Sequence, residues 1–207
     1  MNKYELLQDD KIEVGGRILY RIKALKDFSD VKAGDLGGYI EKEENLSQED
    51  TCWVYDNARV FDDARVFDNA RVYDNARVCG DACVCGNARV FGNARVCGDA
   101  CVCGDAYVYD NARVYGNACV CDNARVYDNA KINKISDVLC ISPIGSRNDT
   151  TTFFKTKDGN IRVKCGCFSG TIDRFLEAVS ETHKDNKHAK AYRLACELAK
   201  VQIELED

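Results

Sequence analysis

Six cysteines of this 207-residue chain form three Cys-Val-Cys pairs, and successive pairs lie 18 residues apart. They are Cys83 and Cys85, Cys101 and Cys103, and Cys119 and Cys121. A group of thiols can make a flat, weakly apolar contact surface, bind a metal ion or join in disulfides. Which of these applies depends on how the fold places the pairs.

A second regular set of residues is basic. Arg77, Arg95 and Arg113 are also spaced 18 residues apart. A column of guanidinium groups can bind an anion or an acidic partner, or can be a solvated face. Ser146 and Arg147, in the polar segment Gly145–Asn148, are further candidates for binding an anion. This segment has no nucleotide-binding motif, and an ordinary hairpin loop is the alternative interpretation.

The chain has few residues of the types that commonly act in catalysis. The two histidines, His183 and His188, both lie near the C-terminus. Cys165 and Cys167 are too close together for a usual zinc or redox motif. A nucleophile and base pair such as Cys167 and His183 has no support from its spacing. We therefore expect no catalytic residue, no metal ion and no cofactor.

A six-residue repeat must position the cysteines and arginines. From Cys52 to about Lys134, Val or Ile recurs at every sixth position, and from Ala58 onward Ala lies two positions earlier. Residues two apart on a strand point the same way, so Ala and Val are expected inside. Asp or Gly followed by Asn or Asp suits a tight corner. This period predicts a triangular parallel β-helix with three repeats, and hence 18 residues, in each coil.

Stacking every eighteenth residue sorts the outward side chains onto three faces. The arginine face carries Arg59, Arg77, Arg95, Arg113 and Lys131, beside Phe61, Cys79, Cys97 and Tyr115. The cysteine face carries Arg65, Phe67 and the three cysteine pairs. The aromatic face carries Trp53, Arg71, Arg89, Tyr107 and Arg125, beside Tyr55, Tyr73, Phe91, Tyr109 and Tyr127. We expect a homo-oligomer, a dimer or trimer, to form through the cysteine face. Parallel strands place ligands in a row rather than in a tetrahedron, which argues against zinc.

The segments on either side of the repeat are expected to cover its ends, because bare strand edges would polymerise. Residues 1–51 are predicted to form a β-rich cap with a strand at Arg17–Ile22, turns at Gly15-Gly16 and Gly37-Gly38, and a short helix near Lys23–Phe28. Residues 52–134 form the β-helix. Residues 135–207 are predicted to form an α+β domain. Its expected strands are Val138–Ile144, Thr151–Thr156 and Ile161–Cys167, with a turn at Asp158-Gly159, and its expected helices are Thr171–His183 and Asn186 or Lys187 to Leu205.

The repeat resembles the hexapeptide-repeat family of left-handed β-helices. Val60-Phe61-Asp62-Asp63-Ala64-Arg65 matches the family pattern at its first and fifth positions and departs from it at the second. The resemblance implies left-handed coils. Many members of that family are trimeric acyltransferases with a histidine base on the coils. The repeat of this chain contains no histidine, so we carry over the fold and not the activity.

The layout of the whole chain also resembles small uncharacterised phage and prophage proteins. The segments that carry this resemblance begin LYRIKALKDFSDVKAGDLGG, SPIGSRNDTTTFF and CGCFSGTIDRFLEAV. Such proteins are often inhibitors of host enzymes or defence systems. The resemblance therefore favours a phage-encoded inhibitor of a host defence system that acts in the host cytoplasm.

Composition limits the remaining classes. The formal net charge of −5 gives no basic surface for nucleic acid. No apolar run approaches the ~18 residues of a membrane span, and the charged first residues do not suit a signal peptide. We expect a cytoplasmic protein with mainly reduced thiols. The predicted function is non-catalytic binding of a host protein or of a small anionic ligand. The alternatives are a hexapeptide-type acyltransferase and a self-assembling structural rod.

Overall fold

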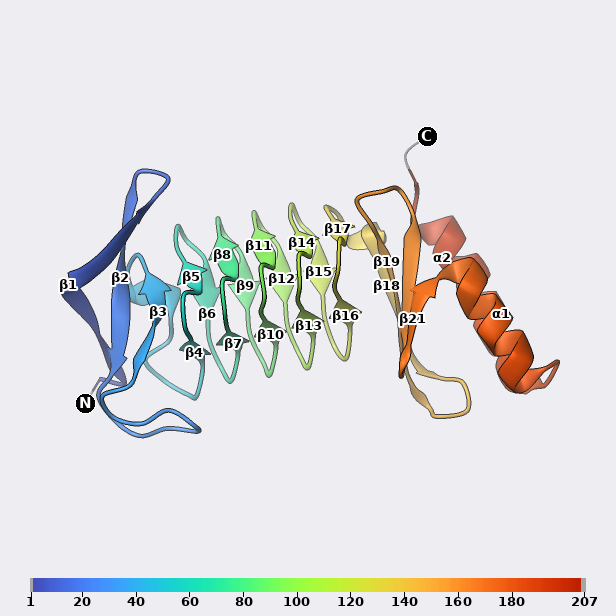
Figure 1. Ribbon diagram of the computed structural model, residues 1–207, viewed down its shortest axis with the longest axis horizontal. Coiled ribbons are helices and arrows are strands. Elements are labelled where there is room, and N and C mark those ends of the chain that lie inside the picture. Colours follow the sequence, from blue (N-terminus) through green and yellow to red (C-terminus); the bar gives the residue numbers. More distant parts are fainter. Residues whose placement is uncertain (1, 206–207) are drawn as a thin grey trace.

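The computed structural model describes residues 2–205 and shows an elongated molecule with three parts (Figure 1). Stacked parallel coils form the middle. An antiparallel sheet covers the N-terminal end, and a second antiparallel sheet with helices α1 (Ile172–His183) and α2 (Lys187–Gln202) covers the C-terminal end. The predicted mainly β architecture, with 18 residues in each coil, is confirmed. Within residues 2–205, neither helix is long and apolar enough to cross a membrane.

Strands that lie 18 residues apart pair in parallel and in register, which builds one sheet on each face of the coil. The arginine face contains β5 (Arg59–Val60), β8 (Arg77–Cys79), β11 (Arg95–Cys97), β14 (Arg113–Val114) and β17 (Lys131–Ile132). The cysteine face contains β6 (Arg65–Val66), β9 (Cys83–Val84), β12 (Cys101–Val102) and β15 (Cys119–Val120). The aromatic face contains β4 (Trp53–Val54), β7 (Arg71–Val72), β10 (Arg89–Val90), β13 (Tyr107–Val108) and β16 (Arg125–Val126).

Alanine and valine fill the interior of the coils, as the repeat predicts. The repeat valines from Val54 to Val126 and the repeat alanines from Ala58 to Ala130 are at most 1% exposed. Removing a valine side chain from water contributes about 1.5–3 kcal/mol. Small and branched side chains alternate along each coil, so that the narrow prism is filled without a polar group inside it.

The corners of the coil depend on residues that tolerate a positive φ. Asp62 and Asp68 have φ values of 61° and 57°, and Gly80 and Gly86 take the equivalent corners one coil later with 69° and 68°. The Asp62 carboxylate accepts a hydrogen bond from the Gly80 N–H at 3.0 Å, and Asp68 does the same for Gly86 at 2.9 Å. The aspartates therefore stabilise the next corner in the stack as well as forming their own.

The N-terminal segment extends the sheet of the arginine face. β1 (Tyr4–Val14) pairs with β2 (Arg17–Ala24), β2 pairs with β3 (Leu36–Ile40), and β3 pairs in parallel with β5. The predicted strand at Arg17–Ile22 is confirmed, whereas the predicted helix near Lys23–Phe28 is wrong. β2 continues to Ala24, whose N–H donates to the Asp35 carbonyl and whose carbonyl accepts from the Gly34 N–H. These bonds use the backbone groups that a helix would need.

Gly37-Gly38 lies inside β3 rather than in a turn, which corrects the prediction. A Cβ atom at Gly37 would lie 2.6 Å from the Val54 carbonyl oxygen, and one at Gly38 would lie 2.5 Å from the Ala58 carbonyl oxygen. Glycine is needed at both positions because the backbone of β3 approaches the first coil so closely. By contrast, Gly15-Gly16 forms the predicted turn between β1 and β2.

The C-terminal sheet has the order β18 (Val138–Ile144), β19 (Asp149–Lys155), β20 (Ile161–Cys165) and β21 (Phe168–Thr171), all antiparallel. The predicted strands and the turn at Asp158-Gly159 are present, and β21 was not predicted. Helix α1 has Thr171 as its N-cap, as predicted, and α2 has Asn186. The helix α2 ends at Gln202, before the predicted Leu205. Both helices pack on one face of this sheet around Phe153, Phe175 and Tyr192.

The two 3₁₀ turns connect the repeat to the flanking sheets. η1 (Glu43–Asn45) leads into the first coil, and η2 (Ile135–Asp137) leads out of the last one. Asn45 is buried, and its amide donates to the carbonyl oxygens of Asp62 and Ala64. The Asp137 carboxylate accepts from the N–H groups of Asn133 and Lys134. Each turn therefore satisfies backbone groups that the end of a coil leaves open.

Candidate functional site

A polar cavity of about 340 Å³ lies where the last coils of the aromatic face meet the C-terminal sheet. Three cationic side chains line it and come from separate segments. Arg125 belongs to β16, Arg147 to the loop between β18 and β19, and Lys164 to β20. Tyr107 of β13 and the hydroxyl-bearing Thr150 and Thr152 of β19 also line it. The cavity thus combines positive charge, hydroxyl groups and an aromatic ring.

Local contacts hold these groups around the cavity. The Arg125 guanidinium lies 5.2 Å from the centre of the Tyr107 ring, within the range of a cation–π contact. The Arg125 backbone N–H donates to the Thr152 hydroxyl at 3.2 Å, which ties the solenoid to β19. Two carboxylates, Asp105 and Asp149, also line the cavity, and Arg147 lies 3.9 Å from Asp149. Three cations face two anions, so the lining has an excess of one positive charge.

The loop that carries Arg147 is positioned by its first residue. Gly145 has a φ of +75°, and a Cβ atom there would lie 1.8 Å from the Tyr192 hydroxyl oxygen. Glycine therefore lets α2 pack directly against this loop through Tyr192. Of the two loop residues predicted to bind an anion, Arg147 lines the polar cavity, and Ser146 lines the neighbouring cavity described next.

A second, largely apolar cavity of about 210 Å³ shares Arg147 with the first. Cys165, Cys167, His183 and Tyr192 contribute to its lining. The Cys165 thiol donates to the Tyr192 hydroxyl oxygen at 3.5 Å, and the His183 ring centre lies 5.8 Å from that of Tyr192. The structure therefore brings thiols and an imidazole to one cavity, which the sequence spacing of Cys167 and His183 did not support.

The predicted arginine column exists and remains on the surface. Arg77, Arg95 and Arg113 are direct neighbours across β8, β11 and β14. Partial burial, together with the charges of Arg59 and Arg95, lowers the pKa of Arg77. These arginines therefore repel one another, and none of them lines either cavity. Their proposed role in anion binding stays a prediction.

The aromatic face is a ladder of stacked rings that is buried at both ends, at Trp53 and at Tyr127. Tyr55 stacks on Tyr73 at 4.5 Å, and Phe91 stacks on Tyr109 at 4.9 Å. Trp53 was predicted to point outward, but it is 1% exposed because the N-terminal segment covers it. Its ring contacts Phe28 at 5.3 Å. The first residue of this face therefore belongs to the core.

The cysteine face brings together all six predicted thiols. Cys83, Cys101 and Cys119 are neighbours in register, and the second cysteine of each pair lies beside this column. All six are half-buried free thiols. Burial and the neighbouring thiols raise the pKa of Cys85 to about 12 and that of Cys121 to about 11. The thiols of Cys85 and Cys121 are therefore protonated at neutral pH.

One pair of cysteines departs from the expectation of mainly reduced thiols. Cys79 and Cys97, on the arginine face, are joined by a disulfide, and their Cα atoms are 4.6 Å apart. They occupy equivalent positions on adjacent coils, and in-register stacking places their side chains opposite each other. The eleven other cysteines are free.

Stability is expected to fall in alkaline solution because several thiols are buried. Burial raises the pKa of Cys196 to about 12 and that of Cys140 to about 11, whereas an unfolded cysteine ionises near pH 8.5. Above that pH the folded state holds more protons than the unfolded state, so the stabilisation present below about pH 8.5 is lost progressively as the pH rises towards the folded pKa values. Urea unfolding measured from neutral pH to about pH 10 would show this slope.

The slope has a matched control. Cys196→Ala should lose less stability between neutral and alkaline pH than the wild type. Cys167→Ala, which removes an exposed thiol, should lose as much stability as the wild type. An equal slope in the wild type and in Cys196→Ala would contradict the assignment to this buried thiol.

The coils, their register and their capped ends define a β-helix repeat protein. A family model described as the YdcK β-solenoid repeat matches residues 64–80, 70–86, 82–98 and 106–122. The chain is also 41% identical over 63 residues to the uncharacterized acetyltransferase YdcK of Escherichia coli (strain K12). That match covers 27% of this chain and 19% of the relative. The chain therefore spans about a fifth of the length of that relative. The ranges matched by the family model all lie in the solenoid.

Most of the cavity residues could not be recognised in the sequence. In the sequence, Arg125 and Tyr107 are not distinguishable from the other members of the repeat, and Lys164 is not distinguishable from other strand residues. The loop residue Arg147 was identified because its segment is polar. Only the position of Arg125 in the sequence could have indicated its role. Arg125 lies in the last complete coil, so it must contact the segment that covers that end.

Proposed function

We propose that the protein is a binding protein that holds a small anionic ligand in the polar cavity between solenoid and C-terminal sheet. The convergence of Arg125, Arg147 and Lys164 supports this proposal. Charge-assisted hydrogen bonds from such groups are stronger than neutral ones, and arginine matches the geometry of phosphate and carboxylate. The Tyr107 ring and the threonine hydroxyls add a surface for the uncharged part of a ligand.

The solenoid acts in this proposal as a rigid support. Arg125 and Tyr107 are held by in-register pairing of β13 with β16, and Arg147 and Lys164 are held by the C-terminal sheet. The contact of Arg125 with Thr152 keeps the two parts together. A pre-organised site of this kind spends little free energy on ordering its own side chains when the ligand binds.

Calorimetry with a fixed panel of anions would test the proposal. The panel contains inorganic phosphate, a nucleoside monophosphate, a dicarboxylate and acetyl coenzyme A. We expect one or more of these to bind, and we expect the Arg147→Gln/Lys164→Gln double variant to bind about tenfold or more weakly, since a hydrogen bond to a charged group contributes about 1.5–3 kcal/mol.

Arg113→Gln is the control. Arg113 takes the same position of the six-residue repeat as the cavity residue Arg125, but it lies outside the cavity. It should leave the affinity unchanged. Failure of the whole panel to bind, or an equal loss of affinity in the control and the double variant, would overturn the proposal.

The similarity to YdcK favours a second candidate, a transferase of acyl groups. The observation that supports it in this chain is the apolar cavity, where His183 lies with Cys165 and Cys167. In such a reaction an amine would attack the acyl carbonyl and the carbon–sulfur bond would break. His183 would accept the proton of the amine and pass it to the sulfur of coenzyme A, which would leave as its thiol. Transfer from acetyl coenzyme A to an amine, abolished in His183→Asn, would replace the binding-only proposal.

The other predicted functions have less support. Neither the fold nor the comparisons support a phage-encoded inhibitor, and the proposed anion binding does not depend on a phage origin. A self-assembling rod is disfavoured because β1–β3 cover one end of the coils and β18–β21 the other (Figure 1). Oligomerisation through the cysteine face stays a prediction.

A further inference from the structure

The cysteine face holds two groups of three sulfur atoms that fit the binding of a soft metal ion. In the first group, the Sγ atoms of Cys83, Cys85 and Cys101 all lie within 4.8 Å of one another. In the second, the same holds for Cys101, Cys103 and Cys119. Cys101 belongs to both groups, so the two sites share one sulfur. This feature lies apart from the polar cavity and does not depend on the proposed ligand.

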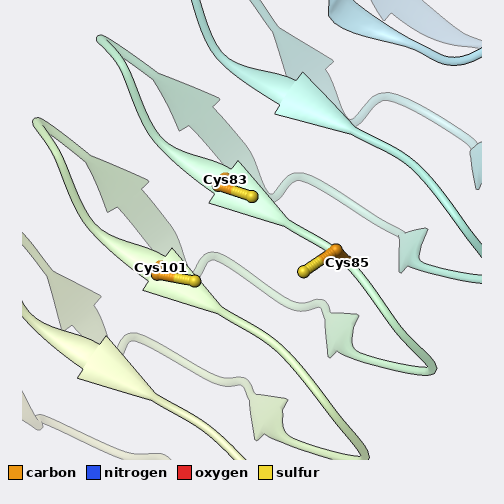
Figure 2. Close-up of side chains that lie close together, drawn as sticks. All are labelled: Cys83, Cys85 and Cys101. Atoms are coloured by element: carbon orange, nitrogen blue, oxygen red, sulfur yellow. The ribbon is translucent and has the colours of Figure 1, made fainter.

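The strand geometry explains why the sulfurs form triangles rather than a single row. Cys83 and Cys101 are direct neighbours on β9 and β12, so their side chains stack. Cys85 comes directly after β9 and two residues after Cys83, and Figure 2 shows its sulfur turned towards the strand that carries Cys101. The third sulfur therefore lies beside the column formed by the other two. The same arrangement recurs one coil later, because the repeat does.

The size of each triangle suits three-coordinate binding. A metal–sulfur bond of about 2.3 Å places three sulfurs around one ion about 4 Å apart in a trigonal plane. The observed upper limit of 4.8 Å leaves only a small contraction to be made by thiols on half-buried side chains. Within residues 2–205, neither group has a fourth cysteine, histidine or carboxylate whose ligand atom lies within 4.8 Å of all three sulfurs.

The number and type of donors select the metal. Structural zinc sites are almost always tetrahedral with four ligands, which these groups do not supply. Thiolates are soft ligands and favour Cu(I) among the ions that bind them. Cu(I) also accepts three-coordination readily. The tetrahedral requirement that argued against zinc at this face is therefore no obstacle to Cu(I).

We propose that the cysteine face binds two Cu(I) ions, one at Cys83, Cys85 and Cys101 and the other at Cys101, Cys103 and Cys119. Each thiol releases its proton to water when it coordinates. Two ions bound through five sulfurs therefore release five protons. Copper enters and stays as Cu(I), so that no electron is transferred.

Anaerobic titration of the reduced full-length protein with Cu(I) would test the proposal. Bathocuproine disulfonate serves as the competing chelator, and thiolate-to-copper charge-transfer absorption reports the bonds formed. We expect two ions for each chain. Cys83→Ser should remove one of them, and Cys101→Ser should weaken the binding of both by more than about tenfold, since even residues outside the ligand shell change metal affinity about 10–100-fold.

Two controls keep the result interpretable. Cys167→Ser removes an exposed thiol elsewhere and should still bind two ions. Cys101→Arg places at this position the residue that the repeat carries at Arg65, so the coil should fold while copper binding is lost. Circular dichroism checks the fold of each variant. Binding that is absent in the wild type, or unchanged in Cys101→Ser, would overturn the proposal, as would two tightly bound Zn²⁺ ions where Cu(I) does not bind.

Discussion

Val96→Asp is expected to abolish the folded state of the solenoid. Val96 lies on β11, is fully buried, and has a coil on either side. The alanines and valines around it offer no partner for a carboxylate. Full burial raises the pKa of a carboxyl by up to about 3–5 units, so the introduced carboxyl is neutral inside the coil, and protonating it at pH 7, about 3 units above its unfolded pKa at 1.36 kcal/mol for each unit, costs about 4 kcal/mol. The lost burial of the valine side chain adds about 1.5–3 kcal/mol. The sum is comparable with the whole stability of a typical domain, about 5–15 kcal/mol.

Circular dichroism and urea unfolding would measure this effect. The matched control is Arg95→Asp, one residue earlier on the same strand, where the side chain is exposed. A surface substitution usually changes stability by less than about 0.5 kcal/mol, so this variant should fold and unfold almost as the wild type does. A cooperative, native-like unfolding transition in Val96→Asp would show that the valine column does not face a closed interior.

The contrast between Val96 and Arg95 also explains why the solenoid could be predicted from sequence. A strand alternates between two sides, and an uninterrupted six-residue period repeats that alternation at every wall of the coil. Once three repeats close a coil, residues 18 apart must be neighbours. The pairing of Cys83 with Cys101 follows from counting alone, and the structure confirms it.

The N-terminal segment could not be predicted in the same way because its pairing is long-range. β1 has the sequence YELLQDDKIEV, in which charged and apolar residues do not alternate regularly. It is a strand because β2 pairs with it along most of its length. The residues after Ala24 form a turn because Asp35 and Gly34 pair with the backbone of Ala24. Such tertiary contacts override local helix propensity.

The candidate site was only partly predictable for a related reason. Arg147 stood out in a polar loop, but Arg125 and Lys164 are separated from it by more than a dozen residues on either side. They meet only because the C-terminal sheet lies against the last coils, through contacts such as that of the Arg125 N–H with the Thr152 hydroxyl. A repeat predicts which of its own residues are neighbours, but it does not predict which segment covers its end.

Both ends of the coil therefore matter as much as its walls. At the C-terminal end, Phe154 of β19 packs on Tyr127 with ring centres 5.2 Å apart, and Asp128 pairs with Arg162. At the N-terminal end, Lys3 is buried and donates hydrogen bonds to the carbonyl oxygens of Glu49 and Cys52. An aromatic ring at each end closes the apolar interior, and polar contacts around it satisfy the backbone groups that the coil leaves open.

Trp53→Ala is expected to destabilise the protein by about 3–5 kcal/mol, the usual cost of truncating a buried tryptophan. Trp53 is 1% exposed and fills the N-terminal end of the coil, where its ring contacts Phe28 at 5.3 Å and Tyr4 at 6.1 Å. Its strand, β4, is the edge strand of the aromatic face at the N-terminal end. Loosening the N-terminal segment would therefore also expose a strand edge, and such edges pair with other chains.

Urea unfolding would give the loss of stability in Trp53→Ala, and sedimentation velocity would show whether the variant associates. Trp53→Phe is the control, because it keeps an aromatic ring between Phe28 and Tyr4 and should lose less than half as much. Tyr55→Ala, on the same face but half-buried, should leave the association state unchanged. A loss below about 1 kcal/mol in Trp53→Ala would mean that the coil closes without its tryptophan, since typical core truncations of this size cost several times more.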